Sequence, residues 1–415
     1  MIPSGNSAIN PWLRIFLPFA AGYFLSYMLR NVNAVIAPEL MRDLAVSAAD
    51  LGLLTSAYLV AFGAFQLPLG ILLDRYGPRR VEATLLLLTA TGAGLFAVGQ
   101  NLTELALARA LIGLGVSACL MAAFKAFSQW FPVRQQAALN SAIMAAGGLG
   151  ALTASTPLGW VLPLIGWRGA FFLLTGVSLL AALIIFSTPD KPASAGKETL
   201  AEQLRGVAQV FSSVAFWRYA PQTALIVGGF MAMQGLWAVP WLMNFIGMSR
   251  DAAAYHLLLM GVGMLIGFVS IAAFVTRLAA RGIHPEYILK AGMAGGLLIT
   301  LLIVVDGAPP QLLWFGMGLV FSVGNLSYAL LSAHFPPHLA GRANTTLNLL
   351  AFAGAFGIQW GFGAAVDAWV AGGMEQRDAY QHTYAWLLGL QAASYAWYVV
   401  SGKLGNRANP AEECS

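Results

Sequence analysis

Long apolar stretches follow one another along the 415-residue chain and are separated by short polar connections. Most of these stretches reach about 20 residues, the length that an α-helix needs to cross a bilayer core ~30 Å thick. Backbone polar groups inside lipid must be satisfied within their own segment, so each stretch is predicted to be a helix. We expect twelve such helices, over residues 12–37, 50–73, 81–101, 104–129, 136–162, 167–187, 217–246, 252–276, 286–305, 311–333, 342–370 and 381–402.

The composition agrees with a membrane protein. Hydrophobic residues make up 59% of the chain and charged residues 9%, with a mean hydropathy of +0.72. A single core in a soluble protein stops growing at roughly 250–300 residues, so this much apolar surface has to face lipid. The 45 glycines suit close helix packing in a bilayer. The predicted fold class is an all-α polytopic membrane protein.

The longest polar stretch, residues 188–213, divides the helices into two sets of six. We therefore expect an N-terminal six-helix bundle over 1–187, a cytoplasmic linker over 188–215 and a C-terminal bundle over 216–415. The linker is expected to hold a short amphipathic helix around Leu200–Phe211. Identical residues recur at an offset of 204 positions, which indicates internal duplication and pseudo-symmetric bundles. The matching pairs are Phe131-Pro132 and Phe335-Pro336, Asn140 and Asn344, Gly150 and Gly354, and Gly159 and Gly363.

Positive charge supplies the predicted orientation. The net charge is +5, and most of the 22 lysines and arginines fall in loops on one side of the predicted bundle. Cytoplasmic loops carry this excess in membrane proteins, so both termini are predicted to be cytoplasmic, in a plasma membrane of the bacterial inner-membrane type. The charge thus indicates a lipid bilayer as partner and does not imply nucleic acid.

A charged loop joins the second and third predicted helices, in the stretch Gly70-Ile71-Leu72-Leu73-Asp74-Arg75-Tyr76-Gly77-Pro78-Arg79-Arg80. It resembles the signature loop of the major facilitator superfamily, which reads G-x-L-x-D-R-x-G-x-R-R. Arg109, followed by Gly113 and Gly115, is similar to the fourth-helix pattern of that family. The resemblance implies secondary transporters with twelve helices in two bundles.

The resemblance also implies a gating role for this loop. Asp74 would face the positive N-terminal end of helix eleven, near residues 342–348, and form a clasp that must break when the cytoplasmic side opens. The arginines of the loop could instead be anchors that follow the positive-inside rule. The expected gating residues are Gly70, Asp74, Arg75, Gly77, Arg79, Arg80 and Arg109.

Arg30 is the clearest candidate for substrate contact, because an ionisable group inside a membrane helix is costly and marks function. Tyr27 shares its face at helical spacing and Asn33 follows closely. The stretch 27–33 resembles the first helix of organic-anion carriers in the superfamily, the organophosphate/phosphate antiporters and the anion/cation symporters, which use an arginine there. Helix seven has Arg218 only at its cytoplasmic end, so a monocarboxylate fits better than a phosphate clamp. Alternatively, Arg30 snorkels or pairs with Glu39 or Asp43.

The second half offers amide and aromatic candidates for the remainder of the substrate cavity. Pro240 is expected to break helix seven, and discontinuous helices often mark transporter binding sites. Each of these side chains could instead make a helix-packing hydrogen bond. The candidates are Gln234, Trp237 and Trp241 in helix seven, with Asn325 and Tyr328 in helix ten.

Acidic residues are expected only near helix ends, as for Glu39, Asp50, Glu104, Asp306 and Asp367. This pattern argues against cation efflux, which commonly needs a buried carboxylate. The chain also lacks a nucleotide-binding loop, a Ser/His/Asp set and metal-ligand spacing. We therefore expect no enzyme activity, no cofactor and no metal.

These observations predict a secondary active transporter that moves a small organic anion by alternating access. A proton or a counter-anion is the expected coupling partner, and a monomer is the expected state. Two alternatives remain open for the cargo, an exporter of drugs or hydrophobic metabolites and a siderophore transporter. A membrane sensor that does not transport is the alternative of another class.

Overall fold

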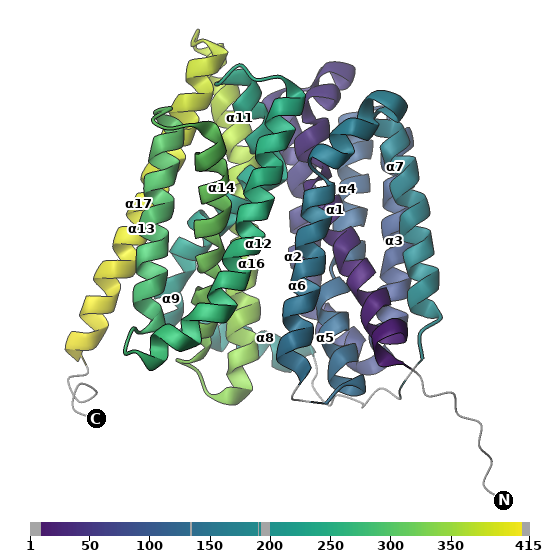
Figure 1. Cartoon of the computed structure of the whole chain (residues 1–415), viewed down its shortest axis with the longest axis vertical. Coiled ribbons are helices and arrows are strands. Elements are labelled where there is room, and N and C mark those ends of the chain that lie inside the picture. The colour runs from purple at the N-terminus through teal and green to yellow at the C-terminus, as the bar shows by residue number, and fades with distance from the viewer. Residues whose placement is uncertain (1–9, 133–134, 190, 192–199, 409–415) are drawn as a thin grey trace, which may run out of the picture.

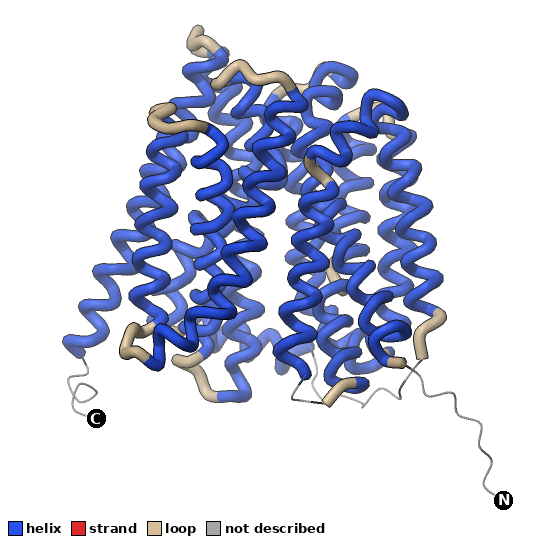
Figure 2. The backbone as a smooth tube through the Cα atoms, in the orientation of Figure 1, coloured by secondary structure: helices blue, strands red, loops and turns tan. Residues whose placement is uncertain are grey.

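The computed structural model of the protein describes residues 10–132, 135–189, 191 and 200–408. Helices account for nearly all of the described chain, and no strand occurs in it (Figure 2). The helices stand side by side, with residues up to 187 on one side of Figure 1 and residues from 214 on the other. The first and last described helices both reach the same end of the bundle, here called the termini end; the opposite end is called the far end.

The first half begins with a π-helical turn, η1 (Trp12–Phe16). Its α-helices are α1 (Leu17–Leu44), α2 (Ala48–Tyr76), α3 (Pro78–Val98), α4 (Leu102–Val116), α5 (Cys119–Trp130), α6 (Gln136–Thr153) and α7 (Thr156–Phe186). Gly166 has φ 65° and ψ 173° inside α7, so α7 consists of two helices that meet at a kink. That kink lies between the predicted fifth and sixth crossings.

The linker helix α8 (Leu200–Phe211) confirms the expected amphipathic segment. The second half continues with α9 (Val214–Gln222), η3 (Thr223–Val227), α10 (Gly228–Ala232), η4 (Met233–Trp237), α11 (Ala238–Asn244), α12 (Arg250–Ala280), α13 (Pro285–Val304), α14 (Pro310–Phe321), η5 (Ser322–Asn325), α15 (Leu326–Ser332), α16 (Pro337–Ala371) and α17 (Gln376–Ala408). In the described chain, ten helices are long and apolar enough to cross a membrane. The shorter α6, which forms one crossing together with the first part of α7, and the more polar α17 make the structure consistent with twelve crossings.

Helix seven differs from its prediction. The chain stays helical from α9 to α11 and passes through Pro240 without a break. Proline cannot donate a backbone hydrogen bond and its ring crowds the carbonyl four residues earlier. The preceding turn, η4, is a π-helix, and a widened turn of this kind relieves such a conflict. Pro240 therefore widens helix seven and does not interrupt it.

The duplicated glycines occupy equivalent places in the two halves. A Cβ atom on Gly150 would lie 2.1 Å from the carbonyl oxygen of Phe24 in α1. A Cβ on Gly354 would lie 2.0 Å from the carbonyl oxygen of Ala224, in the seventh crossing. Only glycine permits such a close approach of two helix backbones. The repeat read from the sequence thus corresponds to a structural pseudo-symmetry.

Candidate functional site

Arg30 lies on α1 between the two halves and is enclosed by aromatic rings. Its guanidinium carbon is 4.7 Å from the ring centre of Tyr27, 5.1 Å from that of Phe62 in α2 and 5.4 Å from that of Phe352 in α16. The face of an aromatic ring attracts a cation, and a desolvated contact of this kind contributes about 2 kcal/mol. Residues from both halves therefore hold one positive charge in a shared apolar setting.

The charge of Arg30 is not neutralised by a neighbouring residue. The side chain is half-buried, and its Nε is buried without a hydrogen-bond partner. No carboxylate of the described chain lies within ion-pair distance of Arg30, since Glu39 pairs with Arg250 and Asp43 pairs with Arg42. These pairs remove the alternative in which Arg30 is bound to Glu39 or Asp43. A guanidinium in this state can receive a carboxylate through its planar fork of donors.

Arg109 lies directly behind Arg30. It is fully buried in α4, and one terminal nitrogen donates a hydrogen bond of 2.9 Å to the backbone carbonyl of Leu29. The ring of Tyr58 is 5.0 Å from its guanidinium carbon. Because Leu29 precedes Arg30, this bond fixes the turn of α1 that presents the candidate substrate residue. The gating role expected for Arg109 stays a prediction, and its observed contact is a positioning one.

Two tyrosines extend the site along α1. The rings of Tyr23 and Tyr27 are 5.1 Å apart, and the hydroxyl of Tyr23 donates to the sulfur of Met144 at 3.8 Å. Gly147 of α6 makes room for both rings, because a Cβ there would approach the Tyr23 ring to 2.6 Å. The first helix, whose residues were singled out in the sequence, thus supplies one wall of the site.

Helix ten supplies a facing polar group. The hydroxyl of Tyr328 donates to the side-chain oxygen of Asn348 at 3.0 Å, and Tyr328 lies within electrostatic range of Tyr27. Asn325 is exposed one helical turn earlier, so it shares that side of the helix. Tyr328 is therefore the helix-ten residue whose contacts are observed, and the role expected for Asn325 stays a prediction.

Other predicted substrate residues lie elsewhere. Asn33 is fully buried within the first half, where its amide donates to Thr55 at 3.0 Å. Gln234 is nearly buried and contacts the sulfur of Met264 at 3.6 Å. Both side chains make helix-packing contacts, the alternative that their sequence pattern left open.

The two tryptophans of helix seven are completely buried. The indole nitrogen of Trp237 donates to the carbonyl of Gln359 at 3.0 Å, and its ring packs on Phe362 with ring centres 5.0 Å apart. The ring of Trp241 packs on Tyr384 with ring centres 5.0 Å apart. Both rings thus belong to the interior of the second half in this conformation, and the structure does not bring them to Arg30.

The charged loop between α2 and α3 is a tight turn. Gly77 has φ 80°, a value in the region that glycine adopts without strain, which accounts for glycine there. Arg79 donates to the carbonyls of Phe186 and Thr188 at 3.4 and 3.2 Å, which ties the loop to the end of α7. Gly70 is half-buried, while Arg75 and Arg80 are exposed. The side chain of Asp74 lies outside the described residues, so its clasp with helix eleven stays a prediction.

A carboxylate does meet a helix N-terminus, but at the far end. Asp367 of α16 accepts hydrogen bonds from the backbone N–H groups of Ala48 at 3.2 Å and Ala49 at 2.7 Å, at the start of α2. An anion is favourable at this position because it satisfies unpaired donors and faces the positive end of the helix dipole. Arg250 of α12 forms an ion pair with Glu39 of α1 nearby. Both contacts join the two halves.

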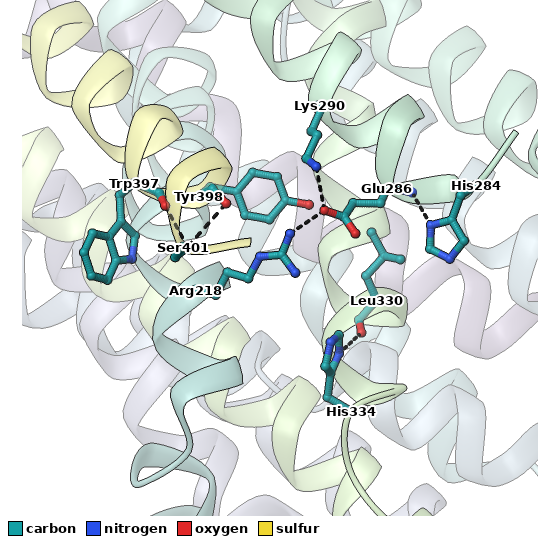
Figure 3. Close-up of polar contacts among 9 residues, drawn as sticks. All are labelled: Arg218, His284, Glu286, Lys290, Leu330, His334, Trp397, Tyr398 and Ser401. Atoms are coloured by element: carbon teal, nitrogen blue, oxygen red, sulfur yellow. Dashed lines mark hydrogen bonds and ion pairs between the residues drawn. The ribbon is translucent and has the colours of Figure 1, made fainter. Parts of the chain in front are cut away.

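The second half carries its own ion cluster at the termini end (Figure 3). Glu286 of α13 forms ion pairs with Arg218 of α9 and, at 2.8 Å, with Lys290. The ring of Tyr398 in α17 lies 5.1 Å from the guanidinium carbon of Arg218. Arg218 is thus neutralised within its own half, which agrees with the expectation that it does not join Arg30 in a two-arginine clamp.

Several residues of the site and one buried acid could not be found from the sequence pattern. Phe62 and Phe352 gave no signal, because their meeting at Arg30 depends on how α2 and α16 pack. Glu82 agrees with the expectation that acidic residues lie near helix ends, since it is the fifth residue of α3, but its complete burial was not predicted. Its side chain is 0% exposed.

Comparison with known proteins identifies the family. The profile of the Major Facilitator Superfamily matches residues 19–358. Among solved structures, the nucleoside transporter NupG superposes with a TM-score of 0.74 at 14% identity over 94% of this chain and 99% of that one. A bacterial homolog of the lysosomal transporter Spinster, in an inward-facing and unoccupied conformation, gives 0.74 at 16% identity over 96% of this chain and 98% of that one. These likenesses show a shared fold.

Curated relatives match parts of the chain. The hexuronate transporter of Escherichia coli strain K12 is 29% identical over 41% of this chain and 40% of its own length. A probable sulfoacetate transporter of Cupriavidus necator is 27% identical over 43% of each chain. A probable galactarate/D-glucarate transporter of Bacillus subtilis is 23% identical over 83% of each. The first two matches thus span about two fifths of those proteins. The profile covers most of this chain, which is a member of the major facilitator superfamily, a family of integral membrane transporters and not of enzymes.

Proposed function

We propose that the protein is a secondary active transporter for small organic anions of the sugar-acid type, with Arg30 as the group that binds the carboxylate. The observation that carries this proposal is the unneutralised guanidinium between the two halves, inside a wall of aromatic rings. A carboxylate matches the fork of the guanidinium, and the C–H faces of a sugar suit aromatic rings. Relatives named for hexuronate, sulfoacetate and glucarate transport support the same substrate class.

The polar groups around Arg30 suit the hydroxyls of a sugar acid. Tyr27 and Tyr328 offer hydroxyls from opposite halves, and Asn348 is already bonded to Tyr328. An aromatic pocket without such groups would favour the drug-exporter alternative. Because aromatic rings from both halves surround one charge, the substrate would lie on the axis about which the halves move.

The transport cycle we propose is alternating access. The far end is held closed by Asp367 on the start of α2 and by the ion pair of Glu39 with Arg250. Opening this end would break both contacts while contacts form at the termini end, where the loop of Arg75, Arg79 and Arg80 lies. In this scheme both termini are cytoplasmic, the membrane is a bacterial inner membrane and one chain forms the complete pathway.

Uptake into proteoliposomes tests the proposal. We expect labelled D-glucuronate to enter vesicles that contain the protein, and Arg30→Ala to abolish its entry. Arg42→Ala is the matched control, because Arg42 lies on the same helix with its side chain 77% exposed. Equal uptake by the Arg30→Ala variant and the unchanged protein would refute the role of Arg30. Binding of the anion without any flux would support the sensor alternative instead.

A further inference from the structure

A second ionisable group inside the first half has no place in the anion site described above. Glu82 of α3 is 0% exposed, and its buried carboxylate oxygens meet no strong hydrogen-bond donor, since the polar group that faces them is the weakly donating thiol of Cys119. No lysine or arginine of the described chain forms an ion pair with it. Buried carboxyl groups are rare, and those left unpaired inside a membrane protein mark functional positions.

Neighbouring helices pack closely around the carboxyl group of Glu82. Gly22 of α1 lies against it, because a Cβ atom there would be 2.3 Å from one carboxylate oxygen. The same Cβ would be 3.3 Å from the side chain of Ile185, at the end of α7. Any larger residue at position 22 would collide with the acid. The close approach of α1 to Glu82 thus depends on glycine at position 22.

One titratable group faces the carboxyl from the helices packed against α3, namely the thiol of Cys119 in α5. The helices α1 and α7 present Gly22 and Ile185, which carry no charge. Arg109 of α4 is directed to the carbonyl of Leu29. On α3 itself, Arg79 is bound to carbonyls at the end of α7. Among the described residues, no lysine or arginine forms an ion pair with Glu82 that would stabilise its ionised form.

The physical chemistry of these surroundings favours the neutral acid. An unpaired carboxylate in an apolar interior has a very unfavourable solvation energy, and such a group binds a proton instead. If another conformation admits water or a cation, the same group releases the proton. A carboxyl with these two states carries one proton per conformational cycle.

Glu82 is close to the anion site. The thiol of Cys119 interacts electrostatically with Glu82 on one side and with Arg30 and Tyr23 on the other. The thiol of Cys119 thus lies on the side of the carboxyl that faces the residues proposed to hold the substrate.

We propose that Glu82 is the proton-binding site through which this transporter couples proton movement to anion transport. The proposal rests on the function proposed above. In the step concerned, water on one side gives a proton to a carboxylate oxygen of Glu82, and water on the other side receives it after the conformational change. A monovalent anion that moves together with this proton transfers no net charge, so the membrane potential does not oppose its entry.

Infrared difference spectroscopy of the purified protein in lipid nanodiscs tests the proton directly, without any transport measurement. We expect the carbonyl stretch of a protonated carboxylic acid at neutral pH, and its loss in Glu82→Gln. Glu104→Gln is the matched control, because it makes the same change in the same half at an exposed position and should keep the band. Identical spectra of Glu82→Gln and the unchanged protein in this region would overturn the proposal.

A second variant allows the same infrared band to be assigned if Glu82→Gln does not fold. Gly22→Ala places a methyl group against the carboxyl, so we expect it to shift the frequency of the same band. A band that keeps its frequency in Gly22→Ala would not belong to Glu82, and the proposal would be wrong.

Transport measurements then distinguish a role of Glu82 in proton coupling from a role in binding the anion. With an inward proton gradient, we expect the unchanged protein and Glu104→Gln to accumulate labelled D-glucuronate, and Glu82→Gln to reach only equilibrium. Exchange of labelled for unlabelled anion should continue in Glu82→Gln. Accumulation by Glu82→Gln would refute the coupling role and leave the proposed function intact. Absence of flux in every protein would refute the proposed function, while the infrared band would still report whether Glu82 holds a proton.

Discussion

Inside the first half, Arg30, Arg109 and Glu82 have no ion-pair partner among the described residues, and Arg109 and Glu82 are completely buried. Inside the second half, Arg218, Glu286 and Lys290 neutralise one another. The two halves share a helical plan, yet these three ionisable groups without an ion-pair partner lie in the first. Ionisable groups buried without such a partner reduce stability and mark functional positions. We infer from this difference that the first half carries the chemistry of the proposed site, while the second supplies a rigid wall.

The aromatic core of the second half fits this division. Trp237 and Trp241 are enclosed by Phe362 and Tyr384, and both tryptophans are fully buried. Large rings packed in this way hold neighbouring helices at fixed distances. The contribution of the second half to the anion site is limited to the groups at its surface, such as Phe352 and Tyr328.

The largest expected effect is a loss of stability, and it tests whether the two halves pack their helices symmetrically. Gly150→Ala and Gly354→Ala each place a methyl group about 2 Å from a backbone oxygen of the neighbouring helix. Overpacking of this kind costs about 1–3 kcal/mol or more, so we expect both variants to lower the melting temperature similarly. Scanning fluorimetry in detergent measures this. Gly357→Ala is the control with no predicted effect, since its Cβ would meet nothing within 4 Å. Destabilisation by only one of the pair would contradict the symmetry.

A smaller effect separates the two kinds of arginine. Arg109→Met removes an unpaired buried charge, so we expect unchanged or higher stability together with weaker anion binding, because Leu29 loses its anchor. Arg218→Met removes one of the two cations that pair with Glu286, so we expect stability to fall by about 1 kcal/mol with little change in anion affinity. Unfolding and titration calorimetry measure the two quantities. The comparison of the halves fails if both variants respond alike.

The smallest effect concerns the contact between the halves at the far end. Asp367→Asn removes the charge from the N-terminus of α2, an interaction of about 0.3–1 kcal/mol. We expect the far end to open more often, so that a cysteine introduced by Met243→Cys reacts faster with a soluble thiol reagent. Asp306→Asn is the control acid outside this contact. An unchanged reaction rate in Asp367→Asn would show that this contact does not keep the far end closed.

The membrane helices were predicted well from the sequence, because each of them appears as a continuous apolar stretch of neighbouring residues. The apolar stretches, the linker helix at Leu200–Phe211 and the boundary between the helices predicted over 136–162 and 167–187 all follow from neighbouring residues. Arg30 was found for the same reason, since one charge in an apolar stretch is conspicuous. The duplicated Gly150 and Gly354 were visible because their spacing repeats.

The remainder of the site depends on packing between distant segments. Phe62 and Phe352 look like ordinary lipid-facing or core residues until α2 and α16 are placed together. The spacing of Trp237 and Trp241 fits a helix face that lines a cavity and equally a face that packs in the protein core. Only the packing of the surrounding helices shows that these rings are in the core. Glu82 stands near the start of its own helix, so only the length of the neighbouring helices reveals its burial.

Arg30 is proposed to recognise the negative charge of the substrate. Titration calorimetry of D-glucuronate against D-glucose tests it most directly, because the two ligands differ in the carboxylate. A charged hydrogen bond contributes about 1.5–3 kcal/mol, so we predict that the protein prefers the acid by roughly 10- to 150-fold and that Arg30→Ala loses this preference, while Arg42→Ala keeps it. An Arg30→Ala variant that still prefers the acid to the same degree would contradict the account.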